Sequence, residues 1–161
     1  MQISNKLRWL PLLFGLNLAL VFAQEQKLRE PDVIFVPTPQ IVVDEMLKVA
    51  NVHKGDVLYD LGCGDGRLVV TAAKQYGVRA VGIDINPERI KESEENARQA
   101  GVTNWVTFRN EDLFEADIKE ATVVTLYLLP DLNVKLRPRL LAQLKPGTRI
   151  VSHQFTLGDW E

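Results

Sequence analysis

The stretch that most constrains the fold of this 161-residue chain is Val57–Arg67, which reads VLYDLGCGDGR. An apolar run here ends in an acid, Asp60, and three alternating glycines follow it. These glycines are Gly62, Gly64 and Gly66. Residues 67–74 then have the composition of a helix. A strand that passes into a helix through glycines lets the backbone approach a ligand that faces the helix N-terminus, as in the first βα unit of an α/β sheet. The stretch therefore predicts an α/β fold with a ligand-binding loop.

The spacing of the acid and the glycines indicates which ligand the loop binds. A dinucleotide fingerprint reads G-x-G-x-x-G and is shaped for a pyrophosphate. This loop reads D-x-G-x-G-x-G, and a carboxylate at its start suits a cation, such as the ammonium of a methionine-like group. The loop resembles motif I of the class I S-adenosylmethionine (SAM) methyltransferases. The resemblance implies that Asp60, Gly62, Gly64 and Gly66 bind SAM, although glycine triplets also occur in ordinary turns.

Two further acids follow the next two predicted strands. Asp84 ends the run 80–84, about 20 residues past the glycines, where an acid hydrogen-bonds the ribose diol in nucleotide-binding α/β folds. Alternatively, Asp84 interacts with the dipole of the helix that Pro87 opens, an effect of about 0.3–1 kcal/mol. In the methyltransferase pattern Asp112, after the predicted strand 102–109, accepts from the adenine amino group. Three acids at three strand ends together favour SAM over NAD.

The N-terminus has the features of a secretory signal peptide. Lys6 and Arg8 precede an apolar run, residues 9–23, that closes on the small residue Ala23. The run is short for a bilayer span, which needs about 20 residues, and an uncleaved membrane anchor is the alternative. We expect residues 1–23 to direct export or membrane anchoring, with a cytosolic location only if this leader is not used. Residues 24–32 then form a linker, and residues 33–161 form one methyltransferase domain.

Composition limits the partners and metals that we expect. A formal net charge of −2 and a pI near 5.8 give no broad basic field, so we expect no nucleic-acid partner. Cys63 is the only cysteine, and the two histidines, His53 and His153, do not form a spaced ligand set. The sequence therefore predicts no metal site.

The pair Thr38-Pro39 predicts a helix that runs to about Ala50, with Thr38 as the N-cap and Pro39 at the first helical position. We also place Thr38 among the cofactor-binding residues. Further along, Pro138 predicts the start of a new helix within 131–144. Residues 148–155 are predicted as a fifth strand.

The run 121–127 is rich in β-branched residues, as expected of a parallel strand buried on both faces. It ends in Tyr127-Leu128-Leu129-Pro130, which we expect to face the acceptor of the methyl group. Amino-methylating class I enzymes often carry Asn/Asp-Pro-Pro-aromatic here, so this chain lacks that polar contact. We predict Tyr127 and Pro130 as catalytic residues, because an apolar mouth would lower the pKa of an acceptor amine towards its neutral form.

A closer resemblance rests on four segments: VPTP at 36–39, DLGCGDGR at 60–67, YLLP at 127–130, and VSHQF at 151–155 with Trp160. These are similar to the family of membrane-associated protein-lysine methyltransferases that act on the ATP synthase c subunit and the adenine nucleotide translocase, together with their prokaryotic relatives. The resemblance implies a protein lysine as acceptor, in a membrane-associated protein.

Class I methyltransferases have a Rossmann-like sheet with strand order 3-2-1-4-5-7-6. Because Glu161 comes just past the predicted fifth strand, we expect the order 3-2-1-4-5 with the usual last two strands missing. The fifth strand would then present an unpaired edge, so either the reading frame is truncated, or a partner or a second copy of the chain completes the sheet. A SAM-binding domain without turnover and a small-molecule methyltransferase are the alternatives to a protein-lysine enzyme.

Overall fold

The computed structural model describes residues 28–160. The predicted signal peptide or anchor, residues 1–23, lies outside this part of the chain, as do residues 24–27 of the predicted linker. Within residues 28–160, no helix combines the length and apolar character that crossing a membrane requires.

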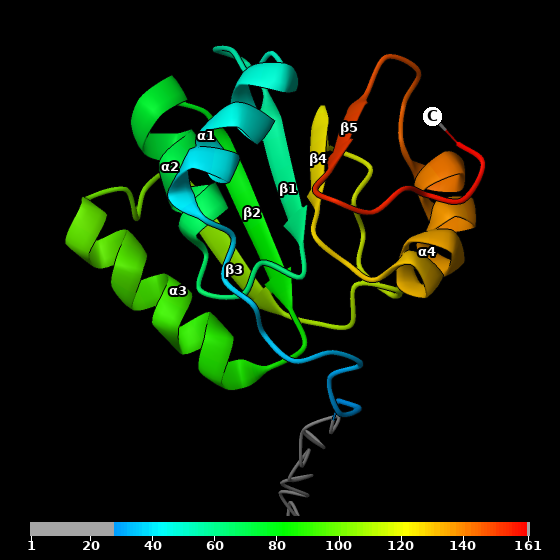
Figure 1. The fold of residues 1–161 in the computed structure, drawn as a ribbon. Coiled ribbons are helices and arrows are strands. Elements are labelled where there is room, and N and C mark those ends of the chain that lie inside the picture. The colour runs from blue at the N-terminus through cyan, green and yellow to red at the C-terminus, as the bar shows by residue number, and fades with distance from the viewer. Residues whose placement is uncertain (1–27, 161) are drawn as a thin grey trace, which may run out of the picture.

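A parallel five-stranded sheet in the order β3-β2-β1-β4-β5 forms the centre of the fold (Figure 1). The strands are β1 Val57–Leu61, β2 Arg79–Asp84, β3 Val106–Asn110, β4 Val123–Leu126 and β5 Arg149–Ser152. Every residue of β1 is buried, because β1 lies between β2 and β4 and its side chains enter the apolar clusters on the two faces of the sheet. The predicted fold class and strand order are confirmed.

Four helices cover the two faces of the sheet (Figure 1). They are α1 Gln40–Val49, α2 Arg67–Tyr76, α3 Pro87–Ala100 and α4 Pro130–Gln143. The first three pack on one face, where Val43, Leu47 and Val69 are fully buried, and α4 packs on the other through Leu136 and Leu140. This arrangement leaves the carboxyl ends of the strands together at one edge of the sheet.

The start of α1 differs from the prediction. The helix begins at Gln40, Pro39 occupies the N-cap position, and no side chain caps the helix. The prediction that Thr38 is the N-cap is therefore wrong. The reason is the backbone of Pro39, whose φ of −56° and ψ of 142° are extended rather than helical.

Pro138 lies inside α4, so the prediction that it starts a new helix is also wrong. Proline removes one helical hydrogen bond, here to the carbonyl of Val134. Both Pro138 and Val134 are exposed, so water can hydrate that carbonyl. The buried side of the helix, which includes Leu136 and Leu140, continues past the proline without a break.

Three predicted strands are shorter in the structure, and the strand predicted over 121–127 is limited to β4, Val123–Leu126. Residues 102–105 form a turn before β3, in which the Trp105 N–H donates to the Val102 carbonyl at 2.8 Å. At the other end, β5 stops at Ser152, and Gln154 has a φ of 67°, which a strand does not allow.

A buried ion pair joins the beginnings of three strands. Asp56, next to β1, accepts from Thr122 Oγ1 at 2.6 Å and from the His53 N–H at 2.9 Å, and it pairs with Arg149 at the start of β5. The Arg149 guanidinium also donates to the carbonyls of Ala50 and Asn51 at 2.9 and 2.7 Å. Arg149 therefore fixes the end of α1 against β5.

The Arg149→Met variant is expected to lose about 3 kcal/mol of unfolding free energy at pH 7, because it leaves a buried carboxylate without its cation. Burial raises the pKa of Asp56, but hydrogen bonds from Thr122, His53 and Arg149 outweigh burial and lower it. The ionised Asp56 therefore contributes to the free energy of unfolding at pH values above its pKa in the unfolded chain, near 4. This contribution is lost as the pH falls through its pKa in the folded protein.

Urea unfolding of this variant and of the wild type at pH 7 and pH 3 measures the difference. The control is Arg79→Met, which breaks the exposed 3.9 Å pair with Glu120 and should cost less than about 1 kcal/mol. Equal losses in the two variants would contradict the assigned role of Arg149.

Candidate functional site

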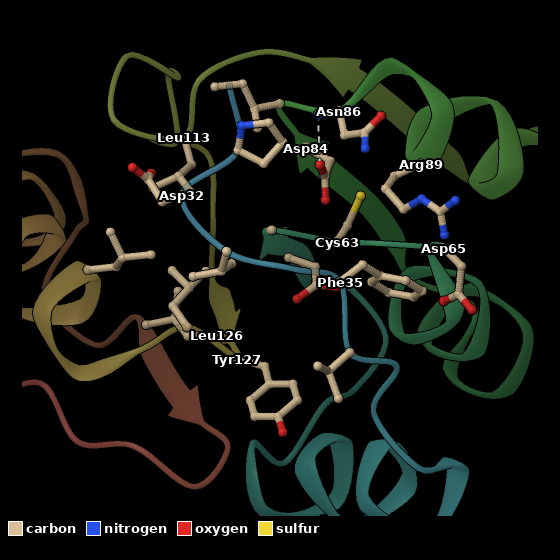
Figure 2. A pocket seen from close by; sticks show the side chains of 18 of the residues that line it. Asp32, Phe35, Cys63, Asp65, Asp84, Asn86, Arg89, Leu113, Leu126 and Tyr127 are labelled. Atoms are coloured by element: carbon tan, nitrogen blue, oxygen red, sulfur yellow. Dashed lines mark hydrogen bonds between the residues drawn. The ribbon is translucent and has the colours of Figure 1, made fainter. Parts of the chain in front are cut away.

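A cavity of about 540 Å³ opens at the carboxyl ends of the strands. Figure 2 shows how side chains from the strand ends and from the segment before α1 surround it. The lining residues include six of the predicted site residues: Thr38, Asp60, Gly62, Asp84, Asp112 and Tyr127. The predicted site residues Gly64, Gly66 and Pro130 are not among the lining residues.

Asp60 lies at the end of the central strand and is 7% exposed. Burial raises its pKa to about 7, and the negative charges of Asp84 and Asp65 add to the rise, while a hydrogen bond from Thr125 Oγ1 at 2.8 Å opposes it. The carboxyl group is therefore partly protonated near neutral pH. A cation that entered the cavity beside it would favour the ionised form.

The second and third glycines of the loop are required by packing. A Cβ atom on Gly64 would overlap the ring of Phe35, and one on Gly66 would lie 2.7 Å from Ser93 and 2.8 Å from Phe108. Both glycines also have a positive φ, 54° and 74°. The predicted loop thus forms, but only the first of its three glycines, Gly62, lines the cavity.

Asp84 connects the glycine loop to the start of α3. Its Oδ2 accepts from the Gly64 N–H and its Oδ1 from the Asn86 N–H, both at 2.9 Å. Each carboxylate oxygen has a second lone pair that remains for a ligand hydroxyl. The carboxylate therefore shapes the loop and offers acceptors to the cavity at the same time (Figure 2).

Asp112 has a partner that the sequence did not reveal. Arg29 donates to its two oxygens, from Nε at 2.5 Å and from Nη2 at 3.2 Å, and the Phe114 N–H adds a bond at 2.9 Å. Burial raises the pKa of Asp112, but these donors together lower it below its usual range. Asp112 is therefore an ionised acceptor on the cavity wall.

The segment before α1 forms a wall of the cavity that sequence reasoning also missed. Phe35 lies against Gly64, and the guanidinium of Arg89 lies 4.8 Å from the Phe35 ring centre. Arg67 pairs with Asp65 and donates to the Thr38 carbonyl at 2.8 Å, so Thr38 is held through its main chain. The one sequence signal was an apolar run, 33–36, without helical or strand periodicity.

Tyr127 follows β4 and bounds the cavity on the side of β5. Its ring centre lies 4.5 Å from that of His153, and its hydroxyl donates to Gln154 Oε1 at 3.3 Å. Leu128 is buried beside it and also lines the cavity, whereas Pro130 begins α4 outside the lining. This wall is apolar and aromatic, in contrast to the three acids on the other strands.

The acceptor groups fit SAM: the buried carboxyl group of Asp60 suits its ammonium, and the carboxylates of Asp84, at the end of β2, and Asp112, just past β3, suit its ribose and its adenine amine. Among residues 28–160, no three His, Cys, Asp or Glu side chains are close enough together to hold a metal ion. The Cys63 thiol is buried, and burial raises its pKa well above the usual range.

Comparison with known proteins gives consistent matches. A family model described as the ANTKMT methyltransferase domain matches residues 60–161. A protein-lysine N-methyltransferase of Saccharolobus islandicus is 51% identical over 131 residues, which are 81% of each chain. The adenine nucleotide translocase lysine N-methyltransferase of Mus musculus is 33% identical over 120 residues, which are 74% of this chain and 52% of that relative.

Among solved structures, an RNA methyltransferase of Salinibacter ruber in complex with S-adenosyl-L-homocysteine is 60% identical. Its TM-score is 0.78, and the match covers 78% of this chain and 82% of that one.

The affinity for SAM is expected to fall as the pH decreases below 7, by up to about tenfold per pH unit. The bound ammonium favours ionised Asp60, so binding releases the proton that the raised pKa retains in the free protein. Calorimetry between pH 5.5 and 7 measures this slope, below the range near pH 8 in which an α-amino group loses its own proton. Asp60→Asn should bind SAM more weakly at pH 7 and without the slope, and an unchanged slope would contradict the assignment.

Proposed function

This chain belongs to the ANTKMT methyltransferase family, and from this we propose that it transfers the methyl group of SAM to the ε-amine of lysine in a protein. The observation that carries the proposal is the contrast between the two sides of the cavity. Acids line the side of the cavity where SAM would bind, and the apolar wall with Tyr127 lines the side where an acceptor amine would enter. The named activity of the Saccharolobus islandicus relative, which matches 81% of this chain, supports a lysine acceptor.

The residues of this chain act mainly by binding and orientation. Bound SAM supplies a methyl group on a sulfonium, which is already activated for transfer. Asp60, Asp84 and Asp112 would hold the ammonium, the ribose and the adenine amine of the cofactor on the side of the cavity opposite Tyr127. The apolar surface of Tyr127 and Leu128 excludes water and lowers the pKa of the lysine amine. A neutral amine held in line with the methyl group needs only correct positioning, which can lower the activation free energy by several kcal/mol.

RNA is the second candidate acceptor, because the Salinibacter ruber structure bears that name. Proteins that bind RNA or DNA backbones rely on Lys and Arg to neutralise phosphates. Here the three arginines of the cavity wall are paired with acids: Arg29 with Asp112, Arg67 with Asp65, and Arg89 with Glu92. Together with the net charge of −2, this pairing favours a protein acceptor.

Labelled SAM offered with a lysine-containing peptide pool or with unmodified RNA tests the choice. We expect label in the peptides as methyl-lysine. Tyr127→Ala should retain SAM affinity within about threefold and reduce transfer by about a hundredfold, because the wall of the acceptor side is lost. The Tyr127→Phe variant distinguishes the role of the ring from that of the hydroxyl. If this variant transfers methyl groups at nearly the wild-type rate, the loss in Tyr127→Ala is due to the ring. Label in RNA alone would contradict the proposal.

We also propose that residues 1–23 are a signal peptide or membrane anchor and that the acceptor is membrane-associated. Lys6 and Arg8 before a 15-residue apolar run support this. To test this, the full-length chain is expressed, the cells are fractionated, and the N-terminus of the chain is identified by mass spectrometry. We expect the chain either cleaved after Ala23 or intact in the membrane fraction. Recovery of the unprocessed chain from the soluble cytosol would contradict both.

Pairing of two copies of the chain along the edge of β5 is a further prediction. Sedimentation measurements would test it.

A further inference from the structure

A second hollow, of about 420 Å³, lies between α1 and β5, and we name it the α1–β5 groove. Its lining consists of Ile41, Val42, Glu45, Met46, Val49, Val151, Ser152, His153 and Gln154. Most of this surface is apolar, and the side chains of Ile41 and Val49 are each 73% exposed. The groove therefore leaves one apolar side of α1 uncovered, next to the edge strand of the sheet.

The two walls of the α1–β5 groove are fixed relative to each other. Arg149, in β5, donates to the carbonyls of Ala50 and Asn51 at the end of α1 and pairs with the buried Asp56. Val43 and Leu47, on the inner side of α1, are fully buried in the core. The groove is thus a preformed surface, and an occupant would not have to order it.

The groove leads to the acceptor side of the SAM cavity. Met46 lines both hollows. Tyr127 of the cavity contacts two groove residues, His153 through its ring at 4.5 Å and Gln154 through its hydroxyl at 3.3 Å. The left-handed backbone of Gln154, with a φ of 67°, is uncommon for a residue other than glycine, and it occurs where the two hollows meet.

The charge of the groove indicates the chemistry of its occupant. Glu45 is the one acidic residue among the nine that line it, and none of the nine is Lys or Arg. The Glu45 carboxylate lies 3.4 Å from Lys48 on the surface of α1. This lining provides no Lys or Arg to neutralise a phosphate backbone. Its aliphatic side chains suit a polypeptide with apolar residues on either side of the lysine that is methylated.

We propose that the α1–β5 groove binds the acceptor protein, receiving the apolar residues that flank the lysine and directing its side chain past Tyr127 to the methyl group. This inference rests on the proposed lysine-methylating function. It adds the surface that recognises the acceptor and the kind of sequence that the enzyme favours.

Two synthetic peptides test the proposal, each with one lysine, flanked by leucine and alanine in the first and by serine and glycine in the second. With the wild-type protein we expect a KM about tenfold lower for the apolar-flanked peptide, because burial of two or three aliphatic groups has that effect. Ile41→Lys should raise the KM for that peptide about tenfold or more, with SAM affinity unchanged. The preference between the two peptides should then disappear.

Leu141→Lys is the matched control, since Leu141 is 62% exposed on α4, which packs on the opposite face of the sheet. It makes the same chemical change away from the groove, and its kinetics should equal those of the wild type. Equal KM values for the two peptides, or equal effects of the two variants, would overturn the inference while leaving lysine methylation intact. Methylation of neither peptide by the wild type would contradict the proposed function itself, and this inference with it.

Sedimentation of the wild type and of both variants examines the competing occupant, a second copy of the chain. A dimer that Ile41→Lys dissociates and Leu141→Lys does not would assign the groove to self-association and overturn the inference. A wild type and an Ile41→Lys variant in the same oligomeric state would support the acceptor as the occupant.

Discussion

The burial of one carboxyl group, that of Asp60, is the constraint on which the site depends. It lies at the end of a strand that is buried throughout, with Thr125 as its hydrogen-bond donor from the neighbouring strand. A charge there is costly without a partner, which is why its pKa rises to about 7. The same burial strengthens the attraction between the carboxylate and a cation, because charges attract more strongly where water is excluded. We therefore expect the affinity of the site for an ammonium to come from a carboxyl group whose ionised form is unfavourable when no cation is bound.

The two sides of the cavity divide the work of a methyl transfer. Carboxylates at the ends of β1 and β2 and just past β3 line one side of the cavity, and the aromatic side after β4 lines the other. Under the proposed function, the carboxylates would recognise the polar groups of the cofactor, and the aromatic side would exclude water from the amine. No strong base is needed for an activated methyl donor, and no metal-binding cluster occurs among residues 28–160. Under the proposed function, the positioning and desolvation of the amine would then account for the chemistry. Residues at the ends of the strands would provide both.

Much of this architecture could be predicted from the sequence because its signals are local. The glycine loop, the acids at strand ends and the β-branched strand lie within short windows, and the strand order followed from the family pattern. The residues that were missed act over long separations: Arg29 contacts Asp112, and Phe35 lies against Gly64. The predicted cap at Thr38 and break at Pro138 failed for a related reason. In both cases the surrounding backbone and solvent exposure decided the outcome, and neither is visible in the sequence pattern.

The salt bridge between Arg29 and Asp112 has a consequence for how the enzyme would meet its acceptor. Arg29 is only six residues past Ala23, and six extended residues span at most about 20 Å. An anchor at residues 1–23 would thus act as a very short tether whose far end is already part of the cavity wall. Acceptors in the same membrane would then meet the site at a high effective concentration, as in any short intramolecular linkage. Weak contacts in the recognition surface would suffice for turnover, and selectivity would depend on which proteins share that membrane.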